Sequence, residues 1–439
     1  MIDTHELKKR DRYLKKLIAF QDTEPVKVVT GIRRCGKSSL LKLMAEHLKN
    51  SGISDEQIVE MNFESHAFKE MTTDEFYDYV KERVLPQKRM YFFFDEVQRV
   101  LNWEDAINSF RVDFNCDIYI TGSNAYLLSS EYSTYLSGRC VEIKMLPLSF
   151  AEFLYFHNFE VKEAKSALGG VRKLVYDRTG EHYELREVFD AYMRFGGMPG
   201  IADVGLDQEK ALMLLEGIYS TVIVCDILER ENRRGQKRIT DPVLLRKIVL
   251  YLADNIGSNI SISSIGNVLV NEGLLEDGKR KGTPSAHTVQ AYVNALLESC
   301  FFYDIKRFDI KGKEFLRTLG KFYVVDIGLR NYLLGFRNRD SGHALENVVY
   351  LELLRRGFDV AIGKVDNSQV DFIATKADNK IYVQVTESMT SEEVRARELA
   401  PLEKISDNYE KMVLSLNPGL DTSYEGIKSI SLVEWLLKE

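Results

Sequence analysis

Short apolar runs alternate with amphipathic stretches along the first 150 residues. The run VKVVT (26–30) predicts a buried strand, and SSLLKLMAEHL (38–48) has apolar residues at the spacing of one helix face. Two more apolar runs, MYFFF (90–94) and CDIYI (116–120), predict further strands; a strand covered on both faces of a parallel sheet has this composition. The fold class that we predict is therefore α/β, with a parallel sheet at its core.

Helical periodicity dominates the middle of the chain. Residues 151–240 are expected to form helices, among them the apolar stretch ALMLLEGIYSTVIVCDILER (211–230). Three amphipathic helices are expected after residue 240, followed by two strand-like segments, CFFYDIKRFD (300–309) and KFYVVDIG (321–328). Three helices and then a β-ribbon is the order of elements in a winged helix.

The last hundred residues predict a small α/β domain. GHALENVVYLELLRRGFDVAIG (342–363) predicts a helix and then a strand, and SQVDFIAT (368–375) and NKIYVQVTES (379–388) predict two more strands. We therefore divide the chain into four domains: a core at 1–150, a helical segment at 151–240, a winged-helix-like domain at 241–335 and an α/β domain at 336–439.

Composition narrows the class of protein. Apolar residues make up 45% of the chain and charged residues 28%, with a net charge of −7, which is typical of a soluble globular protein and not of a protein coated in nucleic acid. The five cysteines form no C-x-x-C pair, so we expect neither a disulfide framework nor a zinc site. The charged N-terminus is not a signal peptide, and we expect a cytoplasmic protein with no membrane partner.

The segment GIRRCGKSS (31–39) matches the G-x-x-x-x-G-K-[ST] pattern of a phosphate-binding loop. It lies between a predicted strand and a predicted helix, so backbone N–H groups and the positive end of the helix would face a phosphate. In such a loop Lys37 reaches the β- and γ-phosphates, and the hydroxyl of Ser38 binds Mg²⁺. The residues expected to hold the nucleotide are Gly31, Ile32, Arg33, Arg34, Cys35, Gly36, Lys37, Ser38 and Ser39.

Two carboxylates follow the buried run MYFFF, where a parallel strand would end beside the phosphate loop. We expect Asp95 to hold Mg²⁺, usually through water, and Glu96 to polarise the attacking water. Arg139 follows a glycine and precedes an alternating strand; it would stabilise the transferred phosphoryl group either in its own chain or in a neighbouring copy of a homo-oligomer. The alternative is that Arg139 is a surface arginine at the start of a strand. The same two interpretations apply to Arg33 and Arg34.

The chain resembles the bacterial and archaeal P-loop ATPases of the AAA type whose C-terminal half is domain of unknown function 4143. The resemblance rests on GIRRCGKSSLL, FFFDEVQRVLNWEDAI, YITGSNAYLLSS, LSGRCVEIKMLPLSFAEFL, FGGMPG, KFYVVDIGLRNYLLG and RELAPLEKISDNYEKMVLSL, and so spans nearly the whole chain. It implies ATP and Mg²⁺ as ligands and a helical lid at 151–240. It also implies that Ser123 or Asn124 senses the γ-phosphate. The alternative is that these residues only form an ordinary turn.

The C-terminal domain resembles the core of the PD-(D/E)XK nucleases, with one departure. Glu346 and Asp371 match the helix Glu and the strand Asp of that core, and Gln384 is a tolerated variant of the next acid. Thr386 stands where the nuclease has a lysine that helps to activate water. A degenerate site used for binding or self-association is therefore favoured over a working nuclease.

DNA contact is the open question for the winged-helix-like domain. Its third helix would offer a weakly basic outer face, although two basic clusters lie nearby, at Arg233, Arg234, Lys237 and Arg238 and at Lys279, Arg280 and Lys281. Docking of a protein client is favoured over DNA. The function we expect is a slow Mg²⁺-dependent ATPase that acts as a nucleotide switch; the alternative is an ATP-gated scaffold or DNA-responsive sensor with negligible hydrolysis, and an ATP-dependent nuclease is the least favoured.

Overall fold

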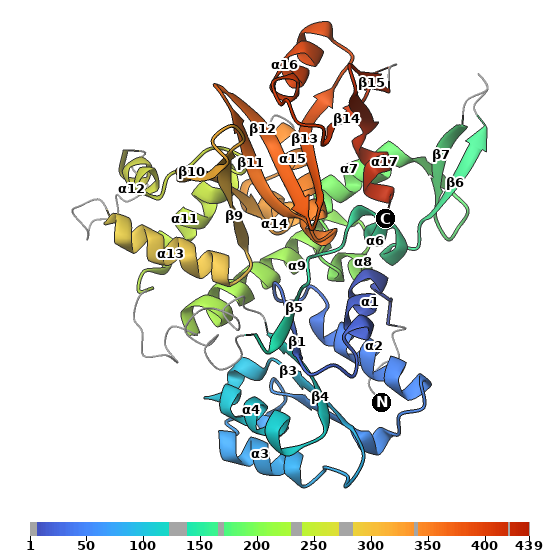
Figure 1. Ribbon diagram of the computed structural model, residues 1–439, viewed down its shortest axis with the longest axis vertical. Helices are drawn as coiled ribbons and strands as arrows, with labels where there is room; N and C mark the ends of the chain where they lie inside the picture. Colours follow the sequence, from blue (N-terminus) through green and yellow to red (C-terminus); the bar gives the residue numbers. More distant parts are fainter. Residues whose placement is uncertain are drawn as a thin grey trace. The chain divides into compact units, whose positions relative to one another are not determined.

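The computed structural model describes residues 7–122, 138–165, 171–229, 239–271, 284–337, 341–419 and 422–438. The chain divides into two compact units (Figure 1). The first comprises Met1–Leu146 with Glu298–Cys300, and the second comprises Pro147–Leu297 and Phe301–Glu439. The four domain boundaries predicted from the sequence remain a prediction.

The first unit is built on a five-stranded sheet in the order β2-β3-β4-β1-β5, in which every neighbouring pair is parallel. The predicted α/β fold class is confirmed. The strands are β1 (Val26–Thr30), β2 (Ile58–Asn62), β3 (Met90–Asp95), β4 (Cys116–Gly122) and β5 (Cys140–Lys144). The helices are α1 (Asp11–Ala19), α2 (Lys37–Asn50), α3 (Thr73–Lys81) and α4 (Trp103–Asp113), with 3₁₀ turns η1 (Asp55–Gln57), η2 (His66–Phe68) and η3 (Val97–Arg99).

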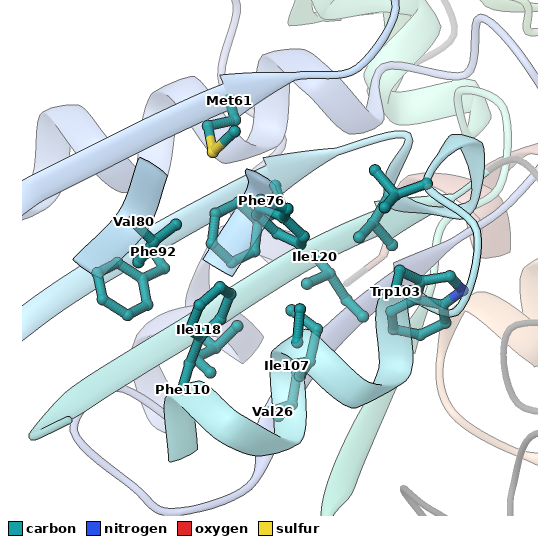
Figure 2. Close-up of a cluster of buried hydrophobic side chains, with 14 of the residues drawn as sticks. Val26, Met61, Phe76, Val80, Phe92, Trp103, Ile107, Phe110, Ile118 and Ile120 are labelled. Atoms are coloured by element: carbon teal, nitrogen blue, oxygen red, sulfur yellow. The ribbon is translucent and has the colours of Figure 1, made fainter. Parts of the chain in front are cut away.

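Aromatic rings fill the core between this sheet and helices α3 and α4 (Figure 2). Phe76 of α3 meets Phe94 of β3 and Phe110 of α4 edge to face, with ring centroids 4.8 and 5.2 Å apart. Such pairs contribute beyond the burial of their apolar area. The packing explains why MYFFFD has no polar residue before Asp95: both faces of β3 are buried.

The second unit begins with a departure from the sequence prediction. Residues 160–184, expected to be helical, form an antiparallel sheet of β6 (Glu160–Lys165), β7 (Val171–Tyr176) and β8 (His182–Glu184). The reason is visible in VRKLVY, whose apolar residues suit a half-buried strand. The helices of this stretch are α6 (Phe150–Phe156), α7 (Leu185–Phe195), α8 (Gly200–Val204), α9 (Gln208–Thr221) and the π-helix η5 (Val222–Glu229).

The helix formed by α9 and most of η5, Gln208–Leu228, is long and apolar enough to cross a membrane by length and composition alone. Core helices of soluble proteins meet the same criterion. Ala211, Leu215, Ile218 and Tyr219 of α9 are buried within the protein, and 39% of the helix's most apolar window is buried.

The predicted order of three helices and a ribbon is present, but the ribbon belongs to a larger sheet. Strands β9 (Phe302–Asp309) and β10 (Glu314–Val324) pair antiparallel, and β9 also pairs with β11 (Asp359–Val365). The resulting sheet has eight strands in the order β10-β9-β11-β12-β13-β14-β16-β15. The three helices are α11 (Pro242–Asp254), α12 (Ile262–Asn271) and α13 (Ala286–Glu298).

The rest of the eight-stranded sheet comes from the C-terminal hundred residues, as predicted for its first three strands. Parallel pairing joins β13, β14 and β16, whereas β12 pairs antiparallel with both of its neighbours. The elements are α14 (Ile327–Leu334), α15 (Ser341–Arg355), β12 (Ser368–Lys376), β13 (Asn379–Ser388), α16 (Glu392–Glu403), β14 (Glu410–Asn417), β15 (Ser423–Tyr424), β16 (Ile427–Ser431) and α17 (Leu432–Leu437).

Two of the motifs that carry the family resemblance meet inside the second unit. In FGGMPG, Gly196 ends α7 with a φ of +78°, and a Cβ atom there would lie 2.3 Å from the carboxylate of Asp326. Asp326 belongs to the other motif, KFYVVDIGLRNYLLG, and caps α14 by accepting from the N–H of Leu329 at 3.0 Å. It also accepts from the N–H of Gly197 at 2.6 Å. Glycine is thus required where α7 and α14 meet.

Candidate functional site

The phosphate loop occupies the carboxyl end of β1 and leads into α2. Gly31 has a φ of +147°, and a Cβ atom there would lie 2.1 Å from the carbonyl oxygen of Met145, so no other residue fits. Gly36 has a φ of +106° and precedes the first residue of α2. This is the strand–loop–helix context in which backbone N–H groups bind phosphate.

Lys37, the first residue of α2, has its ammonium group bonded to the loop itself. The Nζ atom donates to the carbonyl oxygens of Gly31 at 2.9 Å and Ile32 at 3.2 Å. It lies 3.9 Å from a carboxylate oxygen of Glu96. The next residue, Ser38, is exposed. The ammonium, the hydroxyl and the acid at the end of β3 therefore belong to one site.

The underside of the loop is anchored by a residue that the sequence analysis missed. Arg10 is 3% exposed, and its Nη1 atom donates to the carbonyl oxygens of Cys35 at 3.0 Å and Leu146 at 2.8 Å. The thiol of Cys35 is buried against the carbonyl oxygen of Met145 at 3.6 Å, and burial raises its pKa. The side chain of Cys35 is therefore part of the loop's support and does not face a ligand, although it was expected among the nucleotide-binding residues.

Asp95 is held by hydrogen bonds from both neighbouring strands. Asn62 at the end of β2 donates to it at 3.0 Å through Nδ2, and the hydroxyl of Thr121 at the end of β4 donates to its other oxygen. Asp95 is 8% exposed, so its carboxylate is fixed at the edge of the sheet. Carboxylate and hydroxyl oxygens are ligands that Mg²⁺ prefers, and the assignment of Asp95 and Ser38 to that role stays a prediction.

Glu96 adopts a left-handed backbone conformation, with a φ of +56°. Its N–H donates to the hydroxyl of Thr121 at 3.0 Å, which fixes this conformation. Non-glycine residues in this region are uncommon and are enriched at functional sites. The side chain is 5% exposed and accepts a hydrogen bond from Gln98 at 2.6 Å. The strained backbone directs the carboxylate toward Lys37.

Arg33 of the phosphate loop is held by two acids. Its Nη1 atom lies 2.6 Å from Glu64, just after β2, and its Nη2 atom lies 3.7 Å from Glu96. Glu64 also pairs with Arg99 at 3.0 Å. Burial raises the pKa of Glu64, but the hydrogen bond and charge of Arg33 and the charge of Arg99 outweigh it, so the pKa lies below its usual value. The sequence analysis missed Glu64. The signal that could have identified it was its position shortly after a strand of the sheet.

Arg139 does not reach the phosphate loop of its own chain. It directly precedes β5, its carbonyl oxygen accepts from the N–H of Val26, and β5 runs parallel to β1. Arg139 therefore lies beside the start of β1, whereas the phosphate loop follows the end of β1. At the rise per residue of a strand, the length of β1 separates the two by about 15 Å. The predicted role of Arg139 at the phosphate loop of its own chain is therefore wrong. Its role at the loop of a neighbouring copy stays a prediction. Ser123 and Asn124 lie outside the described residues.

In the C-terminal domain the structure brings together Asp371 and Gln384 of the nuclease-like site, and Lys321 links Glu346 to Asp371; Thr386 lies two residues beyond Gln384 on β13. Glu346, Asp371, Gln384 and Thr386 are each less than 10% exposed. Gln384 accepts from the N–H of Asp371 at 2.9 Å, and Asp371 accepts from the N–H of Val385 at 3.0 Å. Glu398 of α16, which sequence analysis missed, accepts from Gln384 at 3.1 Å.

A lysine that the sequence analysis also missed completes this cluster. Lys321 of β10 is 3% exposed; its ammonium group lies 2.8 Å from Glu346 and 4.0 Å from Asp371. The signal for Lys321 in the sequence was a single charged residue at the start of the apolar run KFYVV. Lys376 and Lys380, the sequence neighbours of the site, point elsewhere: Lys376 donates to the carbonyl oxygen of Arg356, and Lys380 lies over the ring of Tyr409.

Burial and neighbouring acids change the protonation of this cluster. Burial, followed by the charge of Glu346, raises the pKa of Asp371 from 3.8 to about 8, despite the opposing charge of Lys321. The environment of this carboxyl therefore favours its protonated form more than that of an exposed aspartate. No group of three or more His, Cys, Asp or Glu side chains that could hold a metal ion occurs in the part of the chain that the structure describes.

The winged-helix-like segment offers a polar face. On α13, Gln290 and Asn294 are exposed and bonded to each other at 2.7 Å, and His287 is exposed near its start. The basic residues from Arg233 to Arg238 and from Lys279 to Lys281 lie outside the described residues. DNA contact through this domain thus stays a prediction.

Comparison with known proteins supports the nucleotide site. An AAA domain family matches residues 23–154, which contain the phosphate loop, Asp95 and Glu96. A domain of unknown function, number 8612, matches residues 186–340. That match covers neither Glu346 nor the strands of Asp371 and Thr386, so the nuclease-like resemblance stays a prediction.

Two solved structures match this chain at low sequence identity. The Walker-type ATPase of Pyrococcus abyssi is 16% identical, with a TM-score of 0.46 over 74% of this chain and 95% of that one. The RuvB Holliday junction branch migration motor of Thermotoga maritima is 13% identical, with a TM-score of 0.31 over 67% and 89%. At these scores neither structure enters the functional argument.

Two relatives match over nearly their whole length. An uncharacterised protein of Haemophilus influenzae is 37% identical over 431 residues, which is 98% of each chain. An uncharacterised protein of Methanocaldococcus jannaschii is 30% identical over 97% of this chain and 90% of its own. The chain belongs to the family of these two proteins, and it contains an AAA-type P-loop nucleotide-binding domain.

Proposed function

We propose that this protein binds Mg-ATP at the phosphate loop, hydrolyses it slowly and uses the nucleotide state as a switch. The observation that carries the proposal is the approach of Lys37 to Glu96, 3.9 Å apart. A group suited to bind phosphate and a group suited to activate water thus share one edge of a parallel sheet, where α/β proteins bind their ligands.

Each residue has a defined task in this proposal. Lys37 and the loop N–H groups bind the β- and γ-phosphates. Asp95 and Ser38 would hold Mg²⁺, which neutralises charge on the phosphates. Glu96 accepts a proton from water as the water oxygen bonds to the γ-phosphorus and the bond to the ADP oxygen breaks.

Slow turnover is supported by the contacts of Glu96. Its carboxylate lies near two cations, Lys37 and Arg33, and accepts from Gln98. These contacts engage the carboxylate that must accept the proton of water, so proton abstraction is expected to be slow until the side chain is released. A γ-phosphate attracts Arg33 and Lys37, which links nucleotide binding to that release.

The runner-up is an ATP-gated scaffold or DNA-responsive sensor that barely hydrolyses ATP. The engaged state of Glu96 also supports this alternative. Turnover of Mg-ATP by the purified full chain, with and without duplex DNA, separates the two. A measurable rate that depends on Glu96 supports the slow ATPase, and a rate at the buffer background supports the scaffold. A protein client and a homo-oligomer are compatible with either.

A nuclease is the least supported function. Lys321 could supply the ammonium group that Thr386 cannot, yet that group is bonded to Glu346, and the raised pKa of Asp371 favours its protonated form. Both features oppose the binding of a divalent metal. We therefore propose that the C-terminal site is structural or serves binding.

A further inference from the structure

The segment that joins the two units differs from an ordinary linker. It comprises residues 145–148, with the sequence MLPL, and the boundary between the units falls between Leu146 and Pro147. All four residues are buried, and none of them belongs to a helix or a strand. Linkers between domains are usually exposed, because the polar groups of irregular backbone need partners. The partners of this connecting segment therefore indicate its role.

The first residue of the connecting segment packs against the phosphate loop. The N–H of Met145 donates to the carbonyl oxygen of Thr30, the last residue of β1, at 2.7 Å. The carbonyl oxygen of Met145 lies where a Cβ atom of Gly31 would be, and it is 3.6 Å from the thiol of Cys35. The Cε atom of Met145 would lie 3.2 Å from a Cβ atom on Gly36. In such close packing the loop backbone cannot shift unless Met145 also moves.

Two side chains of the first unit hold Leu146. Its N–H donates to the hydroxyl of Tyr13 at 3.1 Å, and its carbonyl oxygen accepts from Nη1 of Arg10 at 2.8 Å. The same Nη1 atom donates to the carbonyl oxygen of Cys35 in the phosphate loop at 3.0 Å. One rigid guanidinium thus bridges the loop and the connecting segment. Because Arg10 is buried, separating these two carbonyls would break a buried hydrogen bond, which is costly.

The last two residues of the connecting segment are held within the second unit. The carbonyl oxygen of Pro147 accepts from Nη2 of Arg355, on α15, at 3.0 Å. The N–H of Leu148 donates to the carbonyl oxygen of Gly197 at 2.6 Å. The carbonyl oxygen of Leu148 accepts from the hydroxyl of Tyr192, on α7, at 3.0 Å. A Cβ atom on Gly197 would overlap that carbonyl oxygen, so the approach requires glycine.

Gly197 extends these contacts to the start of α14. Its N–H donates to the carboxylate of Asp326 at 2.6 Å, and Asp326 caps α14. Buried hydrogen bonds therefore connect the phosphate loop to the connecting segment in the first unit, and the connecting segment to the junction of α7 and α14 in the second. Closely packed elements of this kind pass a displacement on instead of absorbing it.

The phosphate loop has a contact that a bound nucleotide would change. The ammonium group of Lys37 donates to the carbonyl oxygens of Gly31 and Ile32. In a phosphate loop this lysine reaches the β- and γ-phosphates, so the two carbonyls would lose this donor when ATP binds. Gly31 is also the loop residue that adjoins the carbonyl of Met145. Nucleotide binding would thus act on the loop where the connecting segment touches it.

We propose that the connecting segment couples the phosphate loop to the junction of α7 and α14, so that each regulates the other. Arg10 and Tyr192 are the positioning residues at its two ends. ATP at the loop alters the hydrogen bonds of Leu148 and Gly197, and by linkage the state of the junction alters the affinity for ATP. This inference rests on the proposed binding of ATP, and it adds the route by which the nucleotide state reaches the second unit.

Hydrogen exchange of the full chain, followed by mass spectrometry with and without saturating Mg-ATP, tests the route from the loop. Exchange in the peptides that contain Leu148 and Gly197 should differ about fivefold or more between the two states, the lower range of coupling between sites. Arg10→Gln should lose this difference. Arg83→Gln is the matched control and should keep it, because Arg83 forms an exposed ion pair with Glu82.

Tyr192→Phe tests the route from the other end. It removes only the hydroxyl that donates to Leu148, and Tyr192 lies on α7 of the second unit. Calorimetry should show an affinity for Mg-ATP changed about threefold or more, the effect of one hydrogen bond. Tyr382→Phe is the matched control, since it removes a hydroxyl bonded to Asp407 in the same unit and should leave the affinity unchanged. Circular dichroism checks that each variant is folded.

The outcomes separate this coupling from the proposed function. If the wild type does not bind Mg-ATP, both are overturned. If ATP binds but exchange at Leu148 and Gly197 does not change, the coupling is overturned and the nucleotide site stands. The coupling is equally overturned if Arg10→Gln keeps the exchange difference, or if Tyr192→Phe binds ATP with the same affinity as Tyr382→Phe.

Discussion

The Nζ atom of Lys37 lies 3.9 Å from a carboxylate oxygen of Glu96, although 58 residues separate them in sequence. The parallel sheet brings them together, because β1 and β3 both end at the edge where β4 lies between them. Asn62 and Thr121 fix Asp95 from either side of β3. This arrangement is the basis of the predictions below.

Lys37→Ala is expected to abolish binding of Mg-ATP without unfolding the protein. The ammonium group bonds to carbonyl oxygens of the phosphate loop, which is the segment expected to bind ATP. Isothermal titration with Mg-ATP measures the loss, and Lys42→Ala serves as the control because Lys42 is exposed on the same helix. An affinity in Lys37→Ala equal to that of the wild type would refute the phosphate-loop assignment.

Glu64→Gln is expected to raise the affinity for ATP by up to about fivefold, the range of a partly exposed ion pair. The carboxylate of Glu64 competes with the γ-phosphate for Arg33, which it holds at 2.6 Å. The comparison is with ADP, whose affinity should change less because it lacks the γ-phosphate. If ATP and ADP affinities rise or fall together, Arg33 does not select for the γ-phosphate.

Asp371→Asn is expected to flatten the dependence of stability on pH. In the folded protein the pKa of Asp371 is about 8, above its ordinary 3.8, so between about pH 4 and pH 8 the folded state binds more protons than the unfolded state. The free energy of unfolding therefore falls as the pH rises through this window. Besides burial, three charged groups act on the pKa of Asp371: Glu346 and Glu398 raise it, and Lys321 lowers it.

Urea unfolding at pH 5 and pH 8 measures this effect through a probe in the second unit, Trp435. Asp366→Asn is the control, because Asp366 lies in an exposed ion pair with Lys311 and should keep the wild-type dependence. An equal loss of stability from pH 5 to pH 8 in Asp371→Asn and the wild type would contradict the raised pKa.

The C-terminal cluster is expected not to cut DNA. Linear, supercoiled and single-stranded DNA should survive incubation with Mg²⁺ or Mn²⁺, with or without ATP, in a gel assay beside Asp371→Ala. Lys321 is paired with Glu346, and the raised pKa of Asp371 favours its protonated form, and both features oppose metal binding. Cleavage by the wild type that disappears in Asp371→Ala would make the protein an ATP-regulated nuclease.

Sequence patterns could predict the candidate nucleotide site because its residues lie at the ends of strands. The loop, Asp95 and Glu96 follow buried strands, and a parallel sheet gathers such ends. The same reasoning could not place Arg139, since the pattern does not tell which end of β5 faces the loop. It also missed Lys321 and Glu64, whose partners lie on other elements of the tertiary fold.

The helical prediction for 151–240 failed at β6, β7 and β8. Apolar runs of five or six residues fit a strand and a helix equally well, and only the turn signals Asn158 and Gly180 marked the sheet. Conversely, the eight-stranded sheet joins β9 and β10 to the C-terminal strands across about 50 residues of chain. No local pattern encodes such a pairing.

Hydrolysis of ATP that depends on Glu96 is the central claim, and turnover of Mg-ATP by Glu96→Gln tests it most directly. Gln keeps a hydrogen-bonding side chain but cannot accept the proton of water, so the variant should bind ATP like the wild type and turn over about 10²-fold more slowly. Glu60→Gln, an exposed acid on β2, is the control and should keep the wild-type rate. An unchanged rate in Glu96→Gln, with ATP binding intact, would contradict the account.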